Sequence, residues 1–151
     1  MMAVVDASVA LKWQFQDEDA TAQAIDLLSD FVEGKVRLIA PTLFSYEIVS
    51  AVNVAINRKR ISEDDGYRAI NYLTSLDIEL CDFIELIEST FHLARQYGRT
   101  PYDCAYMALA ESRQCDFITG DRRLFNAMEN QLSWVKWVGD YTAANHQSPE
   151  S

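Results

Sequence analysis

The sequence predicts a single α/β domain in which a central, mainly parallel sheet of about five strands is flanked by helices on both faces. Two observations predict this fold class. Short apolar runs of strand length alternate with longer segments whose apolar residues recur at helical spacing. Polar caps, glycines and prolines separate these segments. The chain has 151 residues, the length of one domain. We expect the domain to cover residues 1–139 and residues 140–151 to form a polar, flexible tail.

The predicted strands are short apolar runs, and strands that alternate with helices favour parallel pairing. They cover Ala3–Val5, Val36–Ala40, Ile78–Cys81, Asp116–Thr119 and Ser133–Val138. The predicted helices begin at polar caps and end at glycines or basic residues. They cover Ser8–Phe15, Ala20–Val32 behind an Asp19 cap, the segment from Thr42 to the basic cluster Arg58–Arg60, the segment from the Ser62–Asp65 capping box to Leu76, the segment up to Tyr97 and Gly98, the segment from Thr100 and Pro101 to Arg113, and the segment from Asp121 to Met128.

Composition and charge limit the classes of function. The net charge of −10 by itself disfavours nucleic-acid binding and favours a metal ion or a cationic partner. The three cysteines, Cys81, Cys104 and Cys115, lack the spacing of a zinc site and are expected to be reduced thiols. No apolar run is long enough to cross a membrane, and Met1–Val5 lacks the features of a signal peptide. We therefore expect a cytoplasmic protein without membrane association.

Four acidic residues occupy positions from which they could meet. Asp6 and Asp121 directly follow or closely follow predicted strands, Asp103 lies in the first turn of a helix, and Glu47 lies in the second turn of another. Ligands of parallel sheets bind beyond the carboxyl ends of the strands, so these four carboxylates are expected to converge there. Clustered carboxylates repel one another unless a cation is present, and hard oxygen ligands suit Mg²⁺ or Mn²⁺. The sequence therefore predicts a divalent-metal site.

Each of these acids also has a purely structural interpretation. Asp6 and Asp121 could be helix caps, and Asp103 could form a capping box with Thr100. Glu47 projects from or beside the apolar stripe of its helix, where it could pair with an arginine.

Four nearby polar residues are candidates for supporting roles. Ser8 and Thr119 could donate hydrogen bonds to Asp6 and Asp121, with local turn bonding as the alternative. Arg122 and Arg123 follow Asp121 and could contact substrate phosphates, with a solvated helix face as the alternative. Tyr106 is interpreted as a core residue.

Four segments together resemble the PIN-domain family, and more narrowly the VapC-type toxins of toxin–antitoxin pairs. They are VVDASVALKW, APTLFSYEIVSAV, GRTPYDCAYMALA and FITGDRRLF, and the resemblance covers about Ala3 to Val138. It implies a three-layer, Rossmann-like domain acting as a metal-dependent endoribonuclease. It also implies that Asp6 and Asp103 are the firmest ligands of Mg²⁺ (or Mn²⁺), and that Glu47 and Asp121 act directly or through water. The implied partners are RNA and a cognate antitoxin protein, and we expect a homodimer.

Two other functions remain open at this level. The first is a catalytically inert PIN scaffold that only binds a protein partner, which the acidic charge favours. The second is a receiver-like phosphoacceptor domain, because Asp82, Thr119 and Lys136 fall near the ends of three predicted strands. The receiver interpretation leaves Glu47 and Asp103 without a role.

Overall fold

The central sheet of the protein has five parallel strands in the order β3-β2-β1-β4-β5. The computed structural model describes residues 1–82 and 84–144. The strands are β1 (Met2–Val5), β2 (Arg37–Pro41), β3 (Glu79–Cys81), β4 (Asp116–Thr119) and β5 (Val135–Trp137). The predicted fold class and the positions of all five predicted strands are thereby confirmed, with shifts of one or two residues at most ends.

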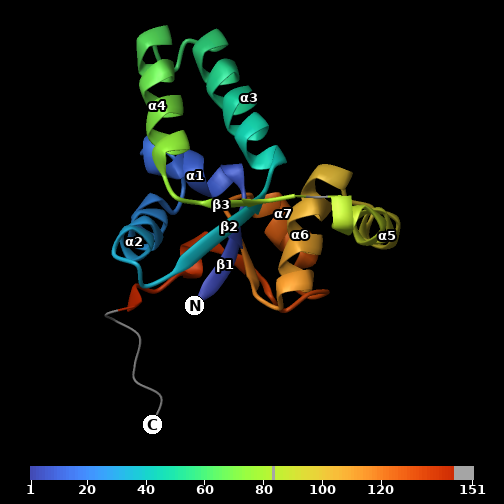
Figure 1. Cartoon of the computed structure of the whole chain (residues 1–151). Coiled ribbons are helices and arrows are strands. Elements are labelled where there is room, and N and C mark those ends of the chain that lie inside the picture. The colour runs from blue at the N-terminus through green and yellow to red at the C-terminus, as the bar shows by residue number, and fades with distance from the viewer. Residues whose placement is uncertain (83, 145–151) are drawn as a thin grey trace.

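Helices cover both faces of the sheet (Figure 1). They are α1 (Ala7–Gln14), α2 (Thr21–Val32), α3 (Leu43–Asn57), α4 (Glu63–Ser75), α5 (Ile87–Tyr97), α6 (Pro101–Arg113) and α7 (Arg122–Met128), with short 3-10 segments η1 (Ile84–Leu86) and η2 (Val138–Asp140). Helix α6 packs on the strands, and α5 packs on the outer side of α6. Helices α1 and α2 pack together on the opposite face of the sheet. Helices α3 and α4 form a hairpin that projects beyond the sheet (Figure 1).

The core is centred on β1 and on α6. Ala3, Val4 and Val5 are fully buried, as expected for a central parallel strand that is covered on both faces. Helix α6 is buried over the seven consecutive residues 104–110, because it lies between the sheet and α5. Its side chains are therefore held firmly, which fixes the direction of its first turn.

The strand order places the carboxyl ends of β1 and β4 side by side. From β1, the chain adds β2 and β3 on one side and later adds β4 and β5 on the other. Val5 at the end of β1 is in register with Ile118 on β4. The residues that follow these strands, from Asp6 and from Thr119 onward, therefore lie next to each other at the point where the strand order reverses, which is where ligands of such sheets bind.

Local capping signals hold at some helix starts and fail at others. The Ser62 and Thr100 hydroxyls accept hydrogen bonds from the backbone N–H groups of Asp65 and Asp103, as predicted. Thr42 makes no side-chain cap bond at the start of α3. The Asp19 cap is also wrong, because α2 begins after Ala20, whose left-handed backbone (φ 60°) turns the chain without a side-chain cap. Asp19 is thereby free to contact other elements.

The end of the described chain is fastened to α2 by the buried Asp30. Its Oδ2 atom accepts hydrogen bonds from the Tyr141 hydroxyl at 2.5 Å and from the Ala144 backbone N–H at 2.8 Å. The first residues of the predicted tail, up to Ala144, thus pack on the domain. Residues 145–151 of that tail lie outside the described residues. None of the helices in the described part of the chain has the length and apolar character needed to cross a bilayer.

We predict that Asp30→Ala lowers the free energy of unfolding by about 2 kcal/mol, because two donors lose their acceptor at a buried position. Urea denaturation followed by circular dichroism measures this change. Asp26→Ala, at an exposed position one turn earlier on α2, is the matched control and should change stability by less than about 0.5 kcal/mol. Equal unfolding midpoints for Asp30→Ala and wild type would contradict the anchoring role.

Candidate active site

Asp6 is buried at the carboxyl end of β1, with 7% of its surface exposed. Its Oδ1 atom caps α1 by accepting a hydrogen bond from the Val9 backbone N–H at 3.3 Å and also accepts one from the Ser8 hydroxyl. Its Oδ2 atom accepts a hydrogen bond from the Thr119 hydroxyl at 2.5 Å. The cap interpretation of Asp6 is therefore right. The same carboxylate nevertheless also binds a residue of β4, so capping does not account for its position.

The ionised form of Asp6 is costly in this position. Burial raises the pKa of Asp6 to about 6, although Ser8, Thr119 and Val9 all donate hydrogen bonds that lower it, and the nearby Asp121 charge raises it further. A cation beside Asp6 would restore the charged form. The structure thus holds a carboxylate that its own hydrogen-bond donors stabilise incompletely.

A tight turn brings Asp121 to the same place. The Gly120 backbone N–H donates to the Ser8 hydroxyl oxygen at 2.8 Å, and the Asp121 N–H donates to the Thr119 hydroxyl oxygen at 3.0 Å. A Cβ atom at Gly120 would lie 3.0 Å from the backbone carbonyl of Ser8, so a larger residue would push the turn away from α1. Asp121 Oδ1 caps α7 by accepting from the backbone N–H groups of Arg123 and Leu124 at 3.0 and 3.2 Å.

Glu47 and Asp103 approach the same edge from α3 and α6. Glu47 Oε1 accepts a hydrogen bond from the Tyr106 hydroxyl at 2.5 Å, so its partner in the described structure is a tyrosine and not an arginine. Asp103 Oδ2 accepts from Arg99 Nη2 at 3.1 Å. Partial burial raises the pKa of both carboxyls, although the Tyr106 and Arg99 contacts lower them.

Electrostatic coupling joins the four acids into one group, which we call the acid cluster (Asp6, Glu47, Asp103 and Asp121). The charge of Asp121 raises the pKa of both Asp6 and Asp103, and the charge of Asp103 raises the pKa of Glu47. Burial raises the pKa of Tyr106, and the charges of Glu47 and Asp6 raise it further, so that its hydroxyl keeps its proton. The structure therefore brings all four predicted acids together at the carboxyl ends of the strands.

The acid cluster is an open arrangement of oxygen donors. Within residues 1–82 and 84–144, no three histidine, cysteine, aspartate or glutamate side chains are gathered closely enough to hold one ion together. Each acid is instead held by its own neighbours: Asp6 by hydroxyls, Glu47 by Tyr106, Asp103 by Arg99 and Asp121 by backbone N–H groups of α7. Mg²⁺ commonly uses only one or two carboxylates and completes its shell with water and substrate phosphate. The donor chemistry fits such a cation.

Several residues of the site were not predicted as functional from the sequence. Tyr106 is a core residue, as predicted, with 2% exposure, and its hydroxyl also reaches Glu47. Its position three residues after Asp103 on α6 was an available signal of this second role. Lys12 is buried on α1 with 3% exposure, and its Cε atom would lie 2.6 Å from a Cβ at Gly120. No sequence signal distinguished Lys12 or Arg99, because their contacts depend on how the elements pack.

The predicted phosphate contacts flank the acid cluster. Arg122 lies with its guanidinium carbon 4.2 Å from the centroid of the Trp137 ring and its Nη2 atom 3.5 Å from Asp19 Oδ2. The Arg123 side chain is exposed on α7. Both arginines thus follow the Asp121 turn on the outside of the site.

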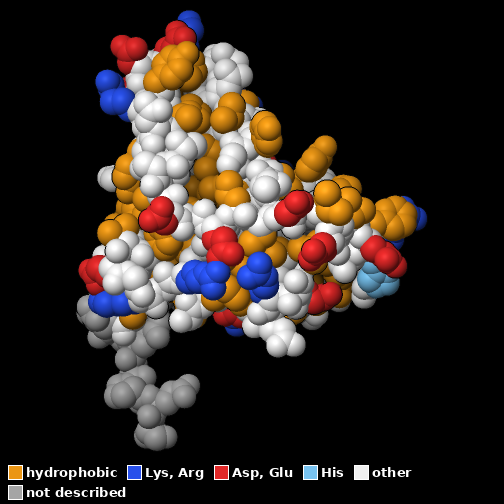
Figure 2. Space-filling view, viewed as in Figure 1, with side chains coloured by type: hydrophobic (Ala, Val, Ile, Leu, Met, Phe, Trp, Pro, Cys, Tyr) orange, Lys and Arg blue, Asp and Glu red, His pale blue; other side chains and the backbone are white. Residues whose placement is uncertain are grey.

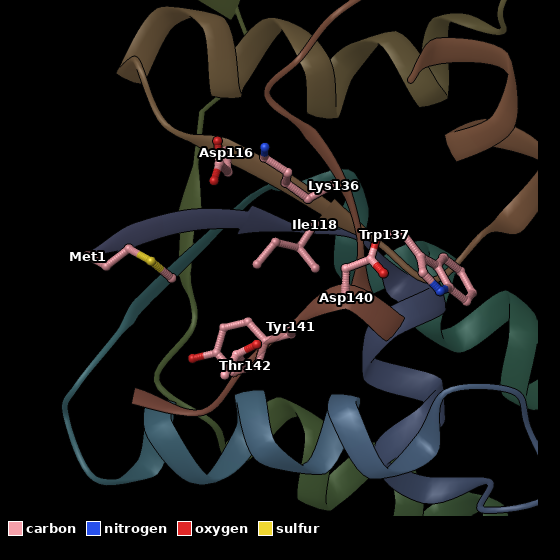
Figure 3. A pocket seen from close by; sticks show the side chains of 8 residues that line it. All are labelled: Met1, Asp116, Ile118, Lys136, Trp137, Asp140, Tyr141 and Thr142. Carbon is pink, nitrogen blue, oxygen red and sulfur yellow. The ribbon is translucent and has the colours of Figure 1, made fainter. Parts of the chain in front are cut away.

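The structure contradicts the receiver-like interpretation. Asp82 follows β3 and Lys136 lies on β5, and these strands form opposite edges of the sheet. The Lys136 side chain lines a pocket of about 250 Å³ with Met1, Asp116 and Tyr141, near the amino ends of β1 and β4 (Figure 3). Thr119, the third residue of that interpretation, donates to Asp6. The three residues therefore cannot form one phosphoacceptor site.

Comparison with known proteins gives a consistent result. The family model described as PIN domain matches residues 3–130. Ribonuclease VapC9 of Mycobacterium tuberculosis is 32% identical over 130 residues, which are 86% of this chain and 94% of that protein. Ribonuclease VapC3 of Pyrobaculum aerophilum is 30% identical over 126 residues, covering 82% of this chain and 92% of that protein.

Two solved structures share the fold. The crystal structure of PAE2754 from Pyrobaculum aerophilum matches with a TM-score of 0.63 and 22% identity over 84% of this chain and 87% of that chain. The structure of VapBC2 from Rickettsia felis bound to a DNA fragment from its promoter matches with a TM-score of 0.60 and 11% identity over 91% of this chain and 97% of that chain. With the family model spanning most of the sheet and all four acids, this protein belongs to the PIN domain family.

Proposed function

We propose that the protein is a Mg²⁺- or Mn²⁺-dependent endoribonuclease that acts as the toxin of a toxin–antitoxin pair. The observation that carries the proposal is the acid cluster, in which a buried aspartate with a raised pKa is coupled to other acids at the switch point of the sheet. The relatives at 30–32% identity are named VapC ribonucleases, which supports RNA as the substrate class.

Some residues of the site would ligate the ion, and others orient the carboxylates that ligate it. Asp6 and Asp103 would ligate the ion, and Glu47 and Asp121 would do so directly or through water. The bound ion would lower the pKa of an attacking water and neutralise the charge that develops on the phosphate. Ser8 and Thr119 fix the Asp6 carboxylate from both sides, and Tyr106 fixes Glu47.

The arrangement does not need a histidine as a general base. His92 is exposed on α5, outside the acid cluster, and His146 lies outside the described residues. An inert PIN scaffold would not need a buried aspartate that its own donors leave incompletely stabilised. The four intact acids therefore favour the enzyme over the scaffold.

We predict that Asp6→Ala, Asp103→Ala and Asp121→Asn each lower ribonuclease activity at least about a hundredfold. The caps that Asp6 and Asp121 provide are worth only about 1 kcal/mol each, so the fold should persist. Cleavage of total cellular RNA with added Mg²⁺, with added Mn²⁺ or with chelator, followed by mapping of the new ends, measures the effect. Glu111→Gln, an exposed acid two turns after Asp103 on α6, is the control and should keep full activity. A wild type that cleaves no RNA with either metal would favour the scaffold.

We predict that millimolar Mg²⁺ or Mn²⁺ raises the melting temperature of the wild type, since an ion that binds only the folded state stabilises it. Asp103→Asn should lose most of this increase, whereas Glu111→Gln should retain it. Thermal denaturation with and without chelator provides the measurement. Identical melting curves at saturating metal would count against the ion site, independently of any RNA substrate.

Protein partners are proposed from charge and apolar exposure. The net charge of −10 attracts basic proteins. An apolar cleft between α3 and α4 is lined by Val49, Val52, Ile56, Tyr67 and Ile70, among others, and Figure 2 shows hydrophobic side chains along this hairpin. A cognate antitoxin would lay an apolar segment there and insert one arginine or lysine among the acids. A second copy of this chain would cover the exposed Leu80, Ile84, Ile87 and Phe91 of β3, η1 and α5.

We predict that light scattering gives twice the mass of one chain for the protein alone, and that the product of the neighbouring gene co-purifies with it. Millimolar Mn²⁺ should weaken the complex, because the inserted cation and the metal compete for the same carboxylates. The Asp6→Asn, Asp103→Asn double variant should bind the antitoxin less tightly than Glu111→Gln does. Equal binding by these two variants would leave steric cover by the antitoxin as the mode of inhibition and exclude an inserted cation.

A further inference from the structure

Three successive acids between α1 and α2 pair with cations of α1, of α7 and of the connection between α3 and α4. Asp17 accepts two hydrogen bonds from Arg60 Nη2, at 2.9 and 3.0 Å, in the connection between α3 and α4. Glu18 lies 3.5 Å from Lys12 Nζ of α1, and Asp19 lies 3.5 Å from Arg122 Nη2 of α7. We call residues 17–19 the acidic loop. Two of the cations that it pairs with, Arg60 and Arg122, are exposed to solvent, whereas Lys12 is buried.

Asp19 connects the acidic loop to the edge of the acid cluster. Its carboxylate contacts Arg122, which directly follows Asp121, and its backbone carbonyl accepts a hydrogen bond from Lys12 Nζ at 2.6 Å. The Trp137 ring has Arg122 at 4.2 Å and Lys12 at 5.6 Å from its centroid. A Cβ at Gly139 would lie only 2.1 Å from Trp137 Nε1, so the ring is packed closely against its own chain. The guanidinium therefore has a fixed aromatic platform.

The carboxylate partner of Arg122 is much easier to remove than the platform. The Asp19 and Arg122 side chains are 68% and 55% exposed and approach to 3.5 Å, whereas Trp137 is 6% exposed. An exposed ion pair of this kind contributes little stability. A phosphodiester shares one charge over two oxygens and can accept two parallel hydrogen bonds from a guanidinium, whereas Asp19 approaches Arg122 through one oxygen at 3.5 Å. Phosphate is thus the better ligand of the same group.

We propose that Arg122, on its Trp137 platform, is a subsite for an RNA backbone phosphate adjacent to the cleaved one, and that Asp19 occupies this subsite until RNA displaces it. The proposal rests on the ribonuclease function proposed above. Lys12 is an anchor of the acidic loop in this scheme and not a phosphate ligand, because it is 3% exposed and already holds the Asp19 carbonyl. Asp19 thereby contributes to ligand specificity, because only a ligand that displaces its carboxylate can contact the Arg122 guanidinium.

The test is a double-variant cycle on RNA binding, measured by fluorescence anisotropy of a short, mixed-sequence, single-stranded RNA in chelator so that no cleavage occurs. Asp19→Asn should bind the RNA about threefold to fivefold more tightly than wild type. Arg122→Gln should bind more weakly, with the slope of log affinity against log salt reduced by about 0.7. In the Arg122→Gln background, Asp19→Asn should gain no more than the control Asp26→Asn, which removes the same charge from an exposed site on α2.

Two results would overturn the proposal. One is an equal gain, or no gain, from Asp19→Asn and Asp26→Asn in the wild-type background. The other is a gain from Asp19→Asn that persists without Arg122. Arg122→Lys, which keeps the charge but cannot bind bidentately, should fall between wild type and Arg122→Gln, and melting curves verify that each variant folds. RNA cleavage by wild type with Mn²⁺ is measured separately: coupling without cleavage contradicts only the nuclease function, and cleavage without coupling contradicts only the Asp19–Arg122 subsite.

Discussion

The burial of one carboxylate, Asp6, is the constraint on which the rest of the site depends. Asp6 must follow β1 directly, because only there do the Ser8 and Thr119 hydroxyls reach its two oxygens from opposite sides. Those donors do not fully offset the loss of water, so the pKa of Asp6 stays raised at about 6. The elements around Asp6 determine how this remaining cost of its ionised form is increased or offset. Gly120 allows the β4–α7 turn to approach α1, and the turn brings a second acid, Asp121, close to the first.

The other two acids come from helices whose positions are set by the core. Helix α6 is buried along most of its length, so its first turn holds Asp103 at a fixed place, and Tyr106 one turn later reaches across to Glu47 on α3. Each carboxylate thus has at least one donor that orients it, and these donors together do not neutralise the four acids. Hydroxyl and backbone donors and the Arg99 guanidinium hold the acids close together, and this is the place where we propose a divalent cation.

The acidic balance of the chain acquires a local meaning around this site. The three acids of the acidic loop form ion pairs with Arg60, Lys12 and Arg122, and Arg122 is next to the acid cluster. The negative charge of Asp19 therefore offsets the positive charge of Arg122, which would otherwise attract nucleic acid beside the acid cluster. In the proposed subsite, RNA would have to replace only the Asp19–Arg122 contact, whereas a basic protein would meet a surface whose net charge attracts it. The same charges would slow an encounter with RNA and would favour the basic protein partner proposed above.

The sequence by itself determined the five strands, most helix starts and the identity of the four acids. These features depend on apolar periodicity and on caps that reach two or three residues along the chain, as from Thr100 to Asp103 and from Asp121 to Leu124. The pairings that build the site were decided by the tertiary structure. Thr119 meets Asp6 across 113 residues and Tyr106 meets Glu47 across 59. Asp19 fitted a local capping pattern, but it leaves α2 uncapped and contacts Arg122 on α7 instead. Such contacts follow from strand order and from the packing of helices on the sheet. No short-range sequence pattern encodes which distant side chains will meet in this way.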